Sequence, residues 1–128
     1  MQGNRIAVSV HVGGTLAANQ TGVFVLPCDA TLEHVSACQS NAGAATLMFG
    51  TVADPDGFKL PVAIGVSNVP TSWGRADFMG ALVPSGNGAL SPLPRLVQGT
   101  AFSWTLDFDG AAGTAGQNVS LLFTFLEG

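Results

Sequence analysis

The sequence predicts an all-β fold, a jelly-roll-like β-sandwich of about eight antiparallel strands with no substantial helix. Apolar residues alternate with polar ones over short stretches, and no segment repeats them at the helical spacing. Glycine and proline, 17 and 7 of the 128 residues, separate these stretches as turns separate strands. A single domain over residues 1–128 is expected, with residues 1–5 as a short N-terminal arm.

Two well-defined strands are expected near the N-terminus. Residues 4–12 place Ile6 and three valines on one face and His11 on the other, so His11 is expected to point outward. Residues 21–27 form the second strand and end at Pro27, which cannot donate to a β-ladder. The alternation of residues 4–12 is typical of a strand with one buried face.

The middle of the chain is more irregular. Residues 28–38 alternate so weakly that their inward face stays undecided. Residues 44–52 are almost continuously apolar, which predicts a central strand, and residues 59–67 contain Pro61, which favours an edge strand. Residues 68–75 are expected to form a loop.

The clearest strand patterns lie at the C-terminus. Residues 76–83 predict one more strand, and residues 84–95, dense in Gly, Pro, Ser and Asn, predict a long surface loop. Residues 101–109 direct Trp104 and three other apolar side chains inward. Residues 117–128 are apolar on both faces, so this strand is expected to be central.

Three glycines between the last two strands, Gly110, Gly113 and Gly116, have a spacing that resembles a phosphate-binding loop. Such a loop must open a helix, because the helix N-terminus supplies the hydrogen-bond donors. Here a strand pattern follows, and no Lys-Ser or Lys-Thr pair accompanies the glycines. The spacing therefore predicts an ordinary connection between strands, without a cofactor.

Four aspartates lie close to turns. Asp107 and Asp109 share one strand face, while Asp54 and Asp56 belong to the sequence DPDG, which begins like a calcium-binding loop. The later ligands and the terminal glutamate of such a loop are missing. Turn formation and solvation are therefore the favoured roles of these aspartates, and no metal site is expected.

No catalytic residue is expected either. Neither His11 nor His34 belongs to a nucleophile motif, and the chain has no GxSxG elbow. Cys28 and Cys38 form no zinc-ligand pattern with the histidines and are expected to be buried free thiols. The sequence thus predicts a protein that is not an enzyme.

The two tryptophans have different expected roles. Trp104 is in phase with a core face of its strand. Trp73 lies in an expected loop beside Arg75, where two alternatives remain open. It either fills a gap in the loop as a partly buried residue, or it is an exposed anchor that stacks on a sugar or contacts a protein.

The chain is unusually poor in charge. Charged residues make up 9% of the sequence, against about 25% in ordinary soluble proteins. This shortage indicates a surface that is covered in an oligomer or larger assembly. With a net charge of −4 and only four basic residues, nucleic acid is not an expected partner. A membrane is not expected either, because no apolar run is long enough to span a bilayer.

Two segments resemble small structural proteins of tailed bacteriophages. In TGVFVLPCDATLEHVSACQS, residues 21–40, an apolar strand runs into a proline, a small polar turn and a further strand. In VQGTAFSWTLDFDGAAGTAGQNVSLLFTFLEG, residues 97–128, a turn, a strand, a loop of small residues and a final strand follow one another. This order of segments is similar to that of capsid decoration (cement) proteins.

The resemblance implies a bacteriophage virion structural protein that binds and stabilises the capsid lattice from the capsid surface and is made in the bacterial host cytoplasm. Its implied partners are the major capsid protein or other virion proteins, and a homo-oligomer is implied, with a homotrimer favoured. A carbohydrate-binding or fibre- or tail-associated module is the alternative. Contacts are expected in residues 1–5, 68–75 and 84–95, and the candidate contact residues are Arg5, Trp73, Arg75, Leu90 and Arg95.

Overall fold

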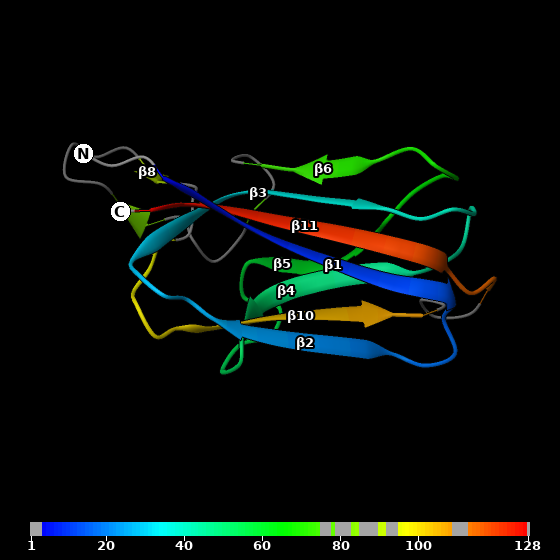
Figure 1. The fold of residues 1–128 in the computed structure, drawn as a ribbon, viewed down its shortest axis with the longest axis horizontal. Coiled ribbons are helices and arrows are strands. Elements are labelled where there is room, and N and C mark those ends of the chain that lie inside the picture. Colours follow the sequence, from blue (N-terminus) through cyan, green and yellow to red (C-terminus); the bar gives the residue numbers. More distant parts are fainter. Residues whose placement is uncertain are drawn as a thin grey trace.

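The computed structural model shows two antiparallel β-sheets packed face to face (Figure 1). It describes residues 4–74, 78, 83–84, 90–91, 95–108 and 113–127. Among these residues there is no helix, and so no helix that could span a membrane. The predicted all-β sandwich is therefore confirmed.

The first sheet has five strands in the order β1-β11-β3-β6, and β9 also pairs with β3. These strands are β1 (Arg5–Thr15), β3 (Ala30–Cys38), β6 (Thr71–Trp73), β9 (Arg95–Leu96) and β11 (Gln117–Glu127). The second sheet has four strands in the order β2-β10-β4-β5. They are β2 (Gln20–Val25), β4 (Thr46–Thr51), β5 (Lys59–Ala63) and β10 (Ala101–Asp107). A separate short pair is formed by β7 (Val83–Pro84) and β8 (Leu90–Ser91).

The connections make this sandwich a jelly roll. From β1 to β4 the chain alternates between the two sheets at every turn, and it crosses again from β5 to β6 and from β10 to β11. The last strand, β11, lies between β1 and β3 and pairs with β1 from Leu126 opposite Arg5 to Val119 opposite Val12. This nesting of late strands between early ones is the double Greek key of jelly-roll domains.

Aromatic side chains join the two sheets in the core. The ring of Phe102 on β10 lies 5.2 Å from that of Phe123 on β11, centroid to centroid, and 5.0 Å from that of Phe24 on β2. Phe102 and Phe123 are both fully buried, and they come from opposite sheets. Such edge-to-face and stacked contacts add to the stabilisation that burial already supplies. The predicted inward face of β10 is confirmed, since Trp104 is also buried.

The weak alternation of β3 has a local cause. Its register against β11 shifts between Thr124 and Phe125, which marks an irregularity of the β-bulge type. As a result Leu32 and Val35 are both fully buried although they are three residues apart. A strict period of two cannot place both on one face, which is why the sequence left the inward face undecided.

Several predicted elements were placed correctly and others were not. β4 and β11 are interior strands and β5 is an edge strand, as predicted. The predicted loop 68–75 is wrong in part, because Thr71–Trp73 forms β6 and pairs with β3. The predicted loop 84–95 likewise contains β8. Most of the strand predicted at 76–83 lies outside the described residues.

Candidate interaction surfaces

The two ends of the sandwich differ in charge. In the described part of the chain, the loops at the right of Figure 1 are residues 16–19, 39–45, 64–70 and 113–116, and none of these residues is Asp, Glu, Lys or Arg. We call this end the uncharged end. The opposite, charged end holds the start of β1, the end of β11 and the turns after β2 and β4. Among the described acidic and basic residues, only Asp107 lies at the end of a strand that points toward the uncharged end.

Hydrogen bonds tie the loops of the uncharged end together. The amide of Leu16 donates to the carbonyl of Gly116 at 2.9 Å, and the amide of Asn68 donates to the carbonyl of Gln39 at 2.8 Å. The buried side chain of Gln39 donates through Nε2 to the carbonyls of Gly43 and Gly65, at 3.0 and 2.8 Å. These bonds hold loops from distant parts of the sequence in one arrangement.

The uncharged end also exposes aliphatic side chains. Val66 and Val69 are 59% and 51% exposed in the loop between β5 and β6. The loop residues around them, 64–70, include no charged residue. Exposed apolar groups without charges at their centre are typical of protein interfaces, whose cores are depleted in charged residues.

The charged end carries two ion pairs. Nε of Arg5 lies 2.6 Å from Oε1 of Glu33, and Nη2 of Arg95 lies 3.5 Å from Oδ2 of Asp29. The pairing register places Arg5 opposite Leu126, Leu126 opposite Thr31, and Thr31 opposite Arg95, in one row across the first sheet. The two arginines are therefore about 14 Å apart, three strand spacings.

The structure brings only two of the predicted contact residues into one row. Arg5 and Arg95 share the row at the charged end and are both exposed. Leu90 belongs to β8, and its side chain, like the whole of Arg75, lies outside the described part of the chain. Arg5 belongs to β1 rather than to an arm, and residues 1–3 are not described.

Trp73 is not the exposed anchor that one of the two sequence hypotheses described. It ends β6, pairs with Val35 of β3, and is only 5% exposed within the core. The cause is the direction of the strand, because Thr71 and Trp73 point inward while Ser72 between them is exposed. A buried indole offers no stacking surface to a sugar, so the carbohydrate hypothesis loses the residue on which it depended.

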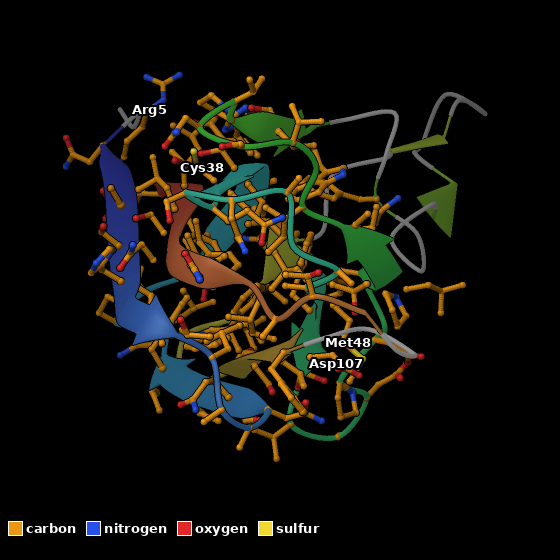
Figure 2. All side chains as sticks on the ribbon, turned by 90° about the vertical axis from the view of Figure 1, so that its right-hand side faces the viewer. Arg5, Cys38, Met48 and Asp107 are labelled. Carbon is orange, nitrogen blue, oxygen red and sulfur yellow. The ribbon has the colours of Figure 1, made fainter. Side chains whose placement is uncertain are left out.

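In the glycine-rich connection between β10 and β11, the described residues 113–116 form neither helix nor strand, as predicted for a loop. The amide of Gly116 donates to the carbonyl of Phe108 at 3.0 Å, and strand β11 follows directly at Gln117. Asp107 lines a shallow groove of about 270 Å³ on the outer face of the second sheet, together with Met48, and Figure 2 shows the two labelled side by side. Asp109 and Gly110 lie outside the described residues.

The remaining titratable candidates are dispersed. His11 is exposed, as predicted, and its Nδ1 lies 2.8 Å from Oγ of Ser120 on the outer face of the first sheet. Cys28 and Cys38 are free thiols, and both are half-buried rather than buried. In the described part of the chain, no three His, Cys, Asp or Glu side chains gather as metal ligands.

The two aspartates of the DPDG turn interact with each other. A hydrogen bond with Asp56 raises the pKa of Asp54 above its ordinary value, and desolvation and the charge of Asp56 raise it further. Both carboxyls lie in the turn between β4 and β5, where the amide of Gly57 donates to the carbonyl of Asp54 at 2.9 Å. This is the turn-forming role that the sequence predicts for these residues.

Comparison with solved structures finds a similar fold in a chain of a viral capsid. A chain from the capsid asymmetric unit of cyanophage Pam1 is similar over 99% of this chain and 87% of its own length, with a TM-score of 0.53 and 16% sequence identity. This likeness shows a common jelly-roll fold.

Weaker likenesses have TM-scores below 0.5. One is to a virus-like particle of the extra small virus of the giant freshwater prawn Macrobrachium rosenbergii, with a TM-score of 0.37, 10% identity, and 98% and 80% of the two chains covered. Another is to the coat protein of Tobacco streak virus, with a TM-score of 0.34, 15% identity, and 95% and 85% covered. No family model and no curated protein matches the sequence.

Proposed function

We propose that this chain is a non-enzymatic virion structural protein, and more specifically a bacteriophage capsid decoration (cement) protein. The observation that carries the proposal is the likeness to the cyanophage Pam1 capsid chain, which covers 99% of this chain and 87% of that one. The order of segments in the sequence, which resembles decoration proteins, supports the finer assignment. The expected location is the capsid surface, and the expected partners are the major capsid protein or other virion proteins.

The surface chemistry supports binding to a protein lattice. The described loops of the uncharged end, residues 16–19, 39–45, 64–70 and 113–116, contain no charged group that would have to be desolvated on contact, and Val66 and Val69 supply apolar area. Burying such area releases about 25 cal/mol per Å². Because hydrogen bonds already fix the loops, little conformational entropy would be lost on binding. We therefore assign the uncharged end as the surface that faces the capsid.

The proposed mechanism is linkage. A protein that binds the assembled lattice and not its free subunits shifts the equilibrium toward assembly. At a free concentration of 100 times Kd, each occupied site stabilises the lattice by about 2.7 kcal/mol. No chemical step is involved. Self-association into a homotrimer, which the resemblance favours, would multiply the contacts made by each decorating particle.

Co-sedimentation with undecorated capsids from the same source tests this function. The wild-type protein is expected to pellet with capsids in a saturable manner. A double variant, Val66→Asp with Val69→Asp, places two charges on the uncharged end and is expected to weaken binding by at least tenfold. Val97→Asp is the matched control, because Val97 is 58% exposed at the opposite end.

The outcomes separate the function from the surface. Absence of wild-type binding to every capsid of the source contradicts the decoration function. Equal loss of binding in the Val97 control, or no loss in the double variant, contradicts the assignment of the uncharged end. Melting temperatures of all variants show whether each remains folded.

A further inference from the structure

Strand β1 forms an open edge of the first sheet. Among the described strands it pairs only with β11, so its other side carries no partner over the length of Arg5–Thr15. Figure 2 shows β1 and β2, in blue, along the same side of the sandwich. Natural proteins usually protect such an edge with proline, charge, a bulge or short length. Arg5 is the only charged residue of β1, the strand contains no proline, and its one register irregularity against β11 lies at the far end, between Val12 and Thr15.

The backbone of β1 has hydrogen-bonding groups directed to this edge. The amide of Glu127 donates to the carbonyl of Asn4 at 2.8 Å, which makes Asn4 a hydrogen-bonded position in the ladder with β11. Hydrogen-bonded and non-bonded positions alternate along an antiparallel pair. Arg5, Ala7, Ser9 and His11 therefore direct their N–H and C=O groups away from β11. These four residues can receive another strand without any loss of bonds inside the chain.

The side chains of β1 are also incompletely covered. Its inward-facing aliphatic residues pack against the core but stay half-buried; they are Ile6, Val8, Val10 and Val12. The inward residues of the neighbouring β11, such as Phe123 and Phe125, are fully buried. Covering the β1 row with apolar side chains of another strand would remove this area from water.

The opposite edges of both sheets are protected. β5 contains Pro61, which cannot donate to an added strand, and β6 has only three residues. β2, the other edge on the open side, is six residues long against eleven for β1. The open edge of one molecule therefore has no matching edge on the far side of another, and the partner edge that fits it is β1 itself.

We infer that β1 is a self-association site, where it pairs antiparallel with β1 of a second copy about a two-fold axis. In the register centred on Val8, Arg5 lies opposite His11 of the other copy and Ala7 opposite Ser9. Ile6 then lies opposite Val10, so the half-buried aliphatic rows cover each other. The register places no two acidic or two Lys/Arg residues opposite each other, and Glu33 of the same chain already pairs with Arg5. A two-fold contact is distinct from the three-fold association that the resemblance favours, and it does not depend on capsid binding.

Charge variants at Ser9 test the pairing. In the proposed register the two copies of residue 9 are diagonal neighbours on the outer sheet face, within reach of long side chains. Ser9→Lys and Ser9→Asp, each alone, are expected to weaken self-association at least tenfold, because like charges then meet across the axis. A mixture of the two variants is expected to recover it. Ser72→Lys, an exposed serine on the other edge strand of the same sheet, is the matched control.

Sedimentation velocity over a concentration series, with circular dichroism to confirm folding, gives the readout. The inference predicts a species of twice the 13.0 kDa chain mass, or a larger even-numbered one, that dissociates in either Ser9 variant and reforms in the mixture. A wild-type protein that stays monomeric at a concentration of about 100 μM, a hundred times a Kd of about 1 μM, overturns the inference. An oligomer that is unaffected by Ser9→Lys, or affected equally by Ser72→Lys, overturns it too. Capsid co-sedimentation of the Ser9 variants stays a separate measurement, so failure of the pairing and failure of the proposed function are distinguishable.

Discussion

Arg5 and Glu33 form an ion pair, 2.6 Å between Nε and Oε1, although their strands do not touch. Arg5 belongs to β1 and Glu33 to β3, and β11 lies between them in the sheet. The arginine side chain therefore reaches over the intervening strand near Leu126, its neighbour on β11. Glu33 lies 28 residues after Arg5 in the sequence, so the pair links the beginning of the chain to a later strand.

This ion pair is expected to contribute little to stability. The side chain of Arg5 is 64% exposed, and pairs at such exposure are worth about 0.2–1 kcal/mol because water and salt screen them. A double-mutant cycle with Arg5→Ala and Glu33→Ala, followed by chemical denaturation, measures the coupling energy. We expect it in this range and expect it to shrink as salt is raised to about 1 M. A coupling well above 2 kcal/mol would contradict this assignment of a screened surface pair.

Gly22 of β2 is expected to tolerate no side chain without a shift of its neighbour. It lies opposite Trp104 of β10, and a Cβ atom at this position would be 2.4 Å from the indole ring. Gly22→Ala should therefore displace Trp104 and destabilise the fold by about 1–3 kcal/mol, as overpacking does. Gly13→Ala is the control, since its Cβ would meet only Nε2 of His11 at 3.8 Å. Urea denaturation followed by tryptophan fluorescence compares the two, and equal midpoints would refute the steric argument.

Gln39 is expected to hold the uncharged end together. Its Nε2 satisfies two carbonyls, those of Gly43 and Gly65, while its Oε1 is buried without a hydrogen-bond partner in the described structure. Gln39→Leu leaves both carbonyls unpaired and should cost about 1–3 kcal/mol of unfolding free energy. Gln39→Glu should cost more at neutral pH, because a buried carboxylate would face those carbonyls.

The effect of Gln39→Glu is expected to decrease in acid, where the protonated carboxyl can again donate one hydrogen bond. Thermal melts of both variants between about pH 4 and 8 measure this difference. Gln20→Leu serves as control, since Gln20 makes a single long bond of 3.4 Å to the carbonyl of Ala18. A Gln39→Leu variant as stable as the wild type would show that the network does not determine the stability of this end.

The strands that the sequence predicted well are those with a regular period. The residues of β10 alternate in the sequence, so Phe102 and Trp104 are predicted on the core face from the pattern alone, although Ser103, predicted to face outward, is also buried. β6 was missed because three residues after Pro70 are too few to show a period, and its formation depends on pairing with β3. The burial of Trp73 follows from that pairing, which is a tertiary effect that no local pattern contains.

The candidate surfaces were predicted less well than the fold. The shortage of charge in the sequence indicated a covered surface, but only the three-dimensional arrangement gathers the uncharged residues 16–19, 39–45, 64–70 and 113–116 at one end. The edge position of β1 likewise depends on the closing strand β11, more than a hundred residues later in the chain, as the pairing of Arg5 with Leu126 shows. Alternation predicts which face of a strand is buried, and it carries no information on which strand is at an edge.

The turn between β4 and β5 gives a pH dependence whose sign is defined. The pKa of Asp54 is raised above 3.8 in the folded state, mainly by its hydrogen bond with Asp56. The folded state therefore binds this proton more tightly than the unfolded state, and stability falls as pH rises from 3.8 through the folded pKa, then stays level. Asp54→Asn should remove this decrease, and Asp56→Asn should reduce it, because it removes the charge of Asp56 while the desolvation of Asp54 remains. Unfolding free energies of the two single variants and the double variant, measured across this interval, should show no added effect in the double variant. If the unfolding free energy of the wild type changes across this interval by the same amount as that of Asp54→Asn, a contribution from this carboxyl pair is excluded.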